Sequence, residues 1–145
     1  MTLSASVVVD TMAVSALVNA GRDPDAAARY RSVIDGRSVV VSFVTVTEMR
    51  FGAIKAGWGE IRRRSLERGL ARLVVVQPDD DLMRTCVELR AACLAAGHAL
   101  GQKVHEADRW IAATAIALGV ELISVDGLHR EIGTPLLLGF PERCR

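Results

Sequence analysis

The fold class follows from the sequence Ala5-Ser6-Val7-Val8-Val9-Asp10, a short apolar run rich in β-branched residues that ends in an acid. Runs of this kind are typical of strands buried on both faces of a parallel sheet. Similar runs occupy residues 38–42, 73–76 and 120–125, and the leucine run 136–138 is a candidate fifth strand. Helical patterns lie between them, at residues 11–19, 23–35, 44–56, 60–70, 79–96 and 106–118.

This alternation of strands and helices predicts an α/β fold, a three-layer α/β/α sandwich with a mostly parallel sheet of about four to five strands. The chain has 145 residues and shows no linker, internal repeat or low-complexity tract. We therefore expect a single domain over residues 1–145. The glycines and polar residues of 97–104 predict one long loop.

The composition excludes several classes of protein. Half the residues are apolar and the net charge is +1, which neither predicts nor excludes a nucleic-acid partner. Three cysteines without a C-x-x-C pair favour a reducing compartment over a disulfide framework or a zinc site. No stretch reaches the roughly 18 apolar residues that a membrane span requires, and no secretory signal is apparent. We expect a cytoplasmic protein with no membrane contact.

Acidic residues follow two of the predicted strands directly. Asp10 comes after the first strand and Asp126 after the fourth. In parallel α/β sheets, ligands bind at the carboxyl ends of the strands, so these positions are candidates for a site. Capping of the following helix is the alternative for either residue alone. Glu48 and Asp108 lie near the starts of helices, which face the same edge of the sheet.

Four carboxylates at one edge would repel one another unless a cation lay between them. Oxygen ligands favour a hard ion, so Mg²⁺ is expected and Mn²⁺ is possible. Such ions activate water and stabilise charge during displacement at a phosphodiester. The acids therefore predict metal-dependent phosphoryl chemistry, without selecting RNA as the substrate.

The motifs that carry these acids occur in a recognisable order. They are Val8-Val9-Asp10-Thr11, then Thr47-Glu48 followed by Gly52, then Asp108-x-Trp-Ile-Ala-Ala-Thr-Ala, and finally Ser124-Val125-Asp126. Together they resemble the PIN-domain family, in particular the VapC toxins of toxin–antitoxin pairs. The resemblance spans residues 7–140. Ser124 stands where the family usually has threonine, and His129 replaces the usual aromatic residue.

The resemblance implies a single PIN domain and a Mg²⁺-dependent endoribonuclease that cleaves cellular RNA of the tRNA or rRNA class. It also implies a homodimer and inhibition by a VapB-like antitoxin. By position, Asp10 and Asp108 correspond to the principal metal ligands and Asp126 completes the metal site. Glu48 corresponds to the residue that holds a metal-bound water or a second ion, so Asp10, Glu48, Asp108 and Asp126 form the expected catalytic set.

Several residues keep two interpretations. Glu106 is a further ligand or a helix-start acid, and Arg109 contacts substrate phosphate or pairs with an acid. The arginine-rich segment 60–72 is a solvated face or a contact surface for the RNA backbone. His98 and His105 are interpreted as isolated surface residues.

Two rival functions remain at this point. A phosphatase of the haloacid-dehalogenase type needs a second aspartate two residues after the first, where this chain has Met12. The other rival is a non-catalytic PIN-like RNA-binding protein, or one that acts without an antitoxin. The presence of all four acids argues against that rival, although their presence does not demonstrate turnover.

Overall fold

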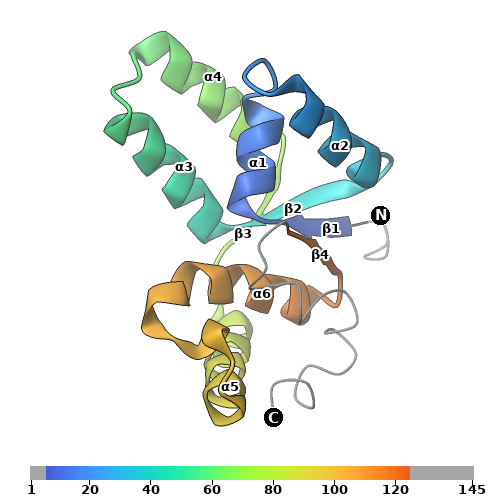
Figure 1. Cartoon of the computed structure of the whole chain (residues 1–145), viewed down its shortest axis with the longest axis vertical. Coiled ribbons are helices and arrows are strands. Elements are labelled where there is room, and N and C mark those ends of the chain that lie inside the picture. The colour runs from blue at the N-terminus through green and yellow to red at the C-terminus, as the bar shows by residue number, and fades with distance from the viewer. Residues whose placement is uncertain (1–5, 125–145) are drawn as a thin grey trace.

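The structure, a computed structural model, describes residues 6–124 and contains a four-stranded sheet within that range (Figure 1). The strands are β1 (Ser6–Val9), β2 (Ser38–Ser42), β3 (Val74–Val76) and β4 (Glu121–Ile123), in the order β3-β2-β1-β4. All three pairings are parallel, with Val8 opposite Val40 and Leu122. The predicted α/β class and parallel sheet are confirmed. The candidate strand at 136–138 lies outside the described residues.

Between residues 6 and 124, six α-helices connect and cover these strands. They are α1 (Thr11–Val18), α2 (Pro24–Ile34), α3 (Phe43–Lys55), α4 (Glu60–Leu70), α5 (Asp80–Ala96) and α6 (Glu106–Leu118). Helices α1 to α4 lie on one side of the sheet and α5 and α6 on the other (Figure 1). This arrangement is the predicted three-layer sandwich. In the described part of the chain, no helix is long and apolar enough to cross a membrane.

The central strand β1 supplies the core of both layers. Val7 and Val9 pack into the cluster that α1, α3 and α4 cover, whereas Val8 packs with Ile111 and Ala115 of α6 on the opposite face. All three valines are fully buried. Successive side chains of a strand point to opposite faces, so a strand covered on both sides has to be apolar at every position.

The ends of the helices follow the expected chemistry. Asp23 and Asp79 accept hydrogen bonds from the backbone N–H groups three residues ahead of them, and so cap α2 and α5. Gly97 and Gly119 close α5 and α6 with φ near +70°, a conformation that residues with a Cβ adopt at a cost.

The segment between α5 and α6 differs from the predicted loop. It folds into two short 3₁₀ turns, η2 (Ala99–Gly101) and η3 (Lys103–His105). Leu100 and Gly101 are buried in it. Glycines and polar residues suggested an open loop because they are poor helix formers, but packing against α5 and α6 gives the segment a regular shape.

Candidate active site

Asp10 is buried at the point where β1 passes into α1. One carboxylate oxygen, Oδ1, accepts a hydrogen bond of 2.9 Å from the backbone N–H of Ala13, so Asp10 caps α1. The other oxygen, Oδ2, accepts a hydrogen bond of 2.6 Å from the hydroxyl of Ser124, which follows β4. Capping is therefore part of the role of Asp10, but it does not account for the second contact, which comes from 114 residues along the chain.

Glu48 is tied to the residue next to Asp10 by a chain of hydroxyl groups. The Thr11 hydroxyl donates to Oε1 of Glu48 over 2.8 Å and lies 3.1 Å from the hydroxyl of Thr45. A hydroxyl has one hydrogen to donate, so the hydrogen between the two threonines has to come from Thr45. Thr45 is completely buried and Glu48 is exposed. The order of donors thus runs from the core outward and ends on a carboxylate.

Asp108 lies in the first turn of α6. This helix precedes β4, which is parallel to β1, so the start of α6 is on the carboxyl side of the sheet, as Figure 1 shows. The Asp108 carboxylate lies 3.4 Å from Nδ1 of His105, and about a third of its side chain is exposed. The positively polarised N-terminus of α6 favours negative charge at this position.

The structure brings the predicted site residues together only in part. Glu48 accepts from Thr11, the residue that follows Asp10 in the chain, and Asp108 lies at the start of α6 on the same edge of the sheet. Asp126 lies outside the described residues. Between residues 6 and 124, no group of three or more His, Cys, Asp or Glu side chains is placed to hold a metal ion. Glu106 is exposed one turn before Trp110, as a helix-start acid would be.

The chemistry of the donors nevertheless fits a hard divalent cation. Within the described part of the chain, each oxygen of Asp10 has one hydrogen-bond donor, and a carboxylate has about four acceptor positions, so the group can accept further contacts. Glu48 is exposed and accepts from Thr11. Asp10 and Glu48 offer oxygen ligands only, which is the set that Mg²⁺ and Mn²⁺ prefer.

Several residues around this edge were not singled out as functional from the sequence. Thr45 and Ser124 orient or support the acids, and their signal was only a hydroxyl side chain adjoining a strand end. Tyr30 of α2 has a raised pKa, first because of its burial and then because of the negative charge of Asp10. Nothing in the spacing of Tyr30 along the chain indicates this proximity.

Arg109 follows neither of its two sequence interpretations. The side chain is buried, and its guanidinium donates to the backbone carbonyls of Leu100 and Gln102. Arg90 donates to the intervening carbonyl of Gly101. The two arginines therefore hold η2 and η3 in place, next to Asp108. No sequence pattern indicates that an arginine will bind backbone carbonyls in this way.

The histidines also differ from their prediction as isolated surface residues. His98 accepts a hydrogen bond from the backbone N–H of Leu100 and so caps η2. His105 is half-buried against Asp108. Both residues thus belong to the structured segment that precedes α6.

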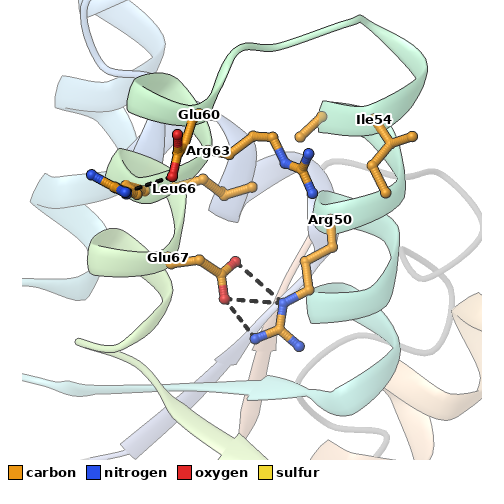
Figure 2. A pocket seen from close by; sticks show the side chains of 8 residues that line it. Arg50, Ile54, Glu60, Arg63, Leu66 and Glu67 are labelled. Carbon is orange, nitrogen blue, oxygen red and sulfur yellow. Dashed lines mark hydrogen bonds and ion pairs between the residues drawn. The ribbon is translucent and has the colours of Figure 1, made fainter.

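The arginines of α4 are partly neutralised by the chain's own groups. Arg62 lies over the ring of Trp58, 3.8 Å from its centre, and Arg64 pairs with Glu60. A groove of about 670 Å³ is lined by residues of α3 and α4. Figure 2 shows Arg50 of α3 and Glu67 of α4 joined by hydrogen bonds in it. The hydrogen bonds from Arg50 lower the pKa of Glu67. Much of this face is therefore a solvated, internally paired surface.

Comparison with known proteins adds two findings. The sequence model of the PIN domain family matches residues 7–134. Among solved structures, the chain is similar to one described as VapBC2 from Rickettsia felis bound to a DNA fragment from their promoter. That similarity has a TM-score of 0.70 at 20% identity and covers 87% of this chain and 92% of the other, which shows a shared fold. No curated protein sequence matches the chain.

Proposed function

Because the chain belongs to the PIN-domain family, we propose that it is a metal-dependent endoribonuclease and the toxin of a VapBC-type toxin–antitoxin pair. The observation that carries this proposal is that Glu48 is held beside the end of β1, next to the residue that follows Asp10. Glu48 is 38 positions from Asp10 in the chain, yet its carboxylate accepts a hydrogen bond from the hydroxyl of Thr11, the residue that directly follows Asp10. A capping aspartate alone would need no such neighbour.

The catalytic set in this proposal is Asp10, Glu48, Asp108 and Asp126, with Asp10, Asp108 and Asp126 holding the metal. The ion is Mg²⁺, and Mn²⁺ can replace it. When bound, such an ion polarises the phosphate and makes a water molecule a better nucleophile. The oxygen donors at this edge support the assignment.

The surrounding residues orient these acids. The Ala13 N–H and the Ser124 hydroxyl hold both oxygens of Asp10, which fixes the plane of its carboxylate. The Thr45–Thr11 hydroxyl chain holds one oxygen of Glu48, which is an exposed residue. A carboxylate fixed in this way loses little conformational freedom when it acts, which favours catalysis.

The substrate in this proposal is cellular RNA of the tRNA or rRNA class. The protein acts in the cytoplasm as a homodimer, and a VapB-like antitoxin inhibits it. Its fold is shared with a solved structure described as VapBC2, which supports a toxin–antitoxin context.

The test is cleavage of total tRNA and rRNA by purified protein, with Mg²⁺ and with EDTA. Wild-type protein should cleave only with the metal. Asp10→Asn and Asp108→Asn should lose at least about a hundredfold in rate, because a catalytic ion contributes several kcal/mol to lowering the barrier. Asp79→Asn is the matched control, since Asp79 also follows a strand and caps a helix but is two strands away from Asp10.

Equal losses in the Asp10 and Asp79 variants would mean that a general effect of replacing a helix-start aspartate, not the loss of a metal ligand, explains the result. RNA binding without cleavage in any metal would instead identify a non-catalytic PIN-like protein.

A further inference from the structure

A second site candidate lies at the opposite edge of the sheet from the carboxylates. A hollow of about 620 Å³ lies where the ends of α1, α2 and α4 meet the starts of β2 and β3. Four arginines line it: Arg31, Arg37, Arg68 and Arg72. We call it the arginine hollow. Asp10 and Glu48 lie at the carboxyl ends of the strands, so the two sites are separate.

The charge of the arginine hollow is unbalanced. Among residues 6–124, no acidic residue lines it, and the one ion pair of its arginines joins Arg37 to Glu121, at 2.8 Å. By contrast, the groove between α3 and α4 contains Glu60 and Glu67 beside its arginines. Arg31, Arg68 and Arg72 are exposed and available to an external anion.

Helix dipoles explain this cluster only in part. Arg31 and Arg68 lie in the last turns of α2 and α4, where a cation offsets the negative end of the dipole. Three helices end near the hollow, and each contributes roughly half a negative charge. Four arginines exceed that total even after Glu121 is counted. Arg37 and Arg72 lie beyond the helix ends and are not explained in this way.

The floor of the arginine hollow is aliphatic. Its apolar residues are half-buried, and most are the outer margin of the core cluster beneath α1 and α4: Leu17, Val18, Ile34, Val39 and Leu73. None of the described residues that line the hollow is aromatic. Single-stranded nucleic acids are usually held by base stacking on aromatic side chains, whereas an aliphatic floor suits aliphatic side chains.

We propose that the arginine hollow binds an acidic peptide segment of a partner protein, with an aliphatic side chain on the floor and carboxylates on the four arginines. Arginine holds carboxylates through two parallel hydrogen bonds, which gives both charge and orientation. The floor is part of the folded core, so the hollow is formed before the peptide arrives and little ordering is required. This binding does not depend on the nuclease activity.

The test follows the side chains of the hollow by NMR in EDTA, so that metal-dependent cleavage plays no part. The probes are the peptide Glu-Leu-Glu-Asp-Leu-Glu and its amide analogue Gln-Leu-Gln-Asn-Leu-Gln, each added to the whole chain. The acidic peptide should shift the arginine Nε–H signals and the methyl signals of Val18, Val39 and Leu73. The amide analogue should bind at least tenfold more weakly, and added salt should weaken the acidic peptide.

Two variants and one matched control locate the binding. Arg68→Ala with Arg72→Ala should weaken the acidic peptide at least tenfold. Arg62→Ala with Arg63→Ala removes the same amount of charge from α4, the helix that carries Arg68, but outside the hollow, and should change affinity less than twofold. Ser65→Trp, at an exposed position on the rim, should block the peptide while all four arginines remain.

Absence of shifts at millimolar acidic peptide would overturn the proposal, as would equal loss in the two double variants. If the amide analogue bound as tightly as the acidic peptide, the hollow would be an apolar binding surface with no preference for carboxylates, which would also overturn the proposal. A twelve-residue RNA that shifted the same signals at lower concentration than the peptide would assign the hollow to nucleic acid instead. None of these results depends on whether the carboxylate edge cleaves RNA.

Discussion

Asp10 combines a structural and a proposed chemical role, and the two separate on substitution. Asparagine keeps an oxygen that can accept from the Ala13 N–H, and aspartate and asparagine are about equal as helix caps. The Ser124 hydroxyl can rotate to accept from the new amide. We therefore expect Asp10→Asn to change the free energy of unfolding by less than about 1 kcal/mol.

Alanine at position 10 removes the cap and leaves Ser124 without this acceptor, so it should cost about 1–3 kcal/mol. Urea unfolding of both variants in EDTA measures the difference. Equal destabilisation by asparagine and alanine would show that the charge itself holds the fold together.

Substitutions of Thr11 also separate an effect on stability from an effect on catalysis. Thr11→Val keeps the shape of the side chain but removes the donor to Glu48 and the acceptor of Thr45, whose hydroxyl is fully buried. An unsatisfied buried hydroxyl costs about 1–3 kcal/mol. Removing a group that orients metal-site residues typically lowers activity by about 10–100-fold. We therefore expect the RNA cleavage rate of Thr11→Val to decrease by about 10–100-fold.

Thr11→Ser is the matched control, because serine keeps the hydroxyl and should retain most of the activity. The RNA cleavage rate and the unfolding midpoint are measured for both variants. Normal cleavage by Thr11→Val would contradict a role for Glu48 that depends on this hydrogen bond.

Among the elements, the segment of η2 and η3 depends on a buried cation. Arg109→Met removes the donors to the carbonyls of Leu100 and Gln102, while the loss of a buried charge relieves some desolvation. We expect the free energy of unfolding to decrease by about 2 kcal/mol. Hydrogen exchange should become faster at the backbone N–H groups of residues 101, 102 and 105. Arg84→Met, which breaks an exposed ion pair with Asp80, should have no measurable effect. Unchanged exchange in Arg109→Met would mean that the helices alone hold the segment.

The same segment contains a glycine whose replacement should destabilise the protein. A Cβ on Gly101 would lie 2.9 Å from the backbone nitrogen of Leu94 in α5, closer than real contacts allow. Gly101→Ala should therefore destabilise the protein by about 1–3 kcal/mol, as overpacking of a core does. Gly52 lies inside α3 with open space around its Cβ position, so Gly52→Ala should stabilise by about 0.5–1 kcal/mol. Thermal unfolding of the two variants should thus shift in opposite directions.

For the molecule as a whole, local patterns predicted the layers and missed the contacts between distant segments. Strand and helix positions follow from apolar runs and caps such as Asp23 and Asp79, which are read within a few residues. Three of the four acids fall in the described part, and all three lie at or near the predicted edge. The hydroxyl chain from Thr45 and the carbonyl contacts of Arg109 could not be predicted, because each joins segments whose relative placement depends on tertiary packing.

Metal binding should be visible in the stability of the whole molecule. An ion that binds only the folded state raises the free energy of unfolding by about 1.4 kcal/mol for each tenfold increase in Mg²⁺ above its dissociation constant, and two independent ions raise it by twice that. We expect the slope of one ion, because the proposed function gives the protein a single set of metal ligands, Asp10, Asp108 and Asp126. Asp10→Asn should flatten this slope, and Asp79→Asn should leave it unchanged. Urea unfolding across a Mg²⁺ series measures it, with Ca²⁺ as a second hard ion for comparison. A wild-type slope of zero while RNA is still cleaved would mean that the ion arrives with the substrate, and the acids would then complete their site only around the phosphodiester.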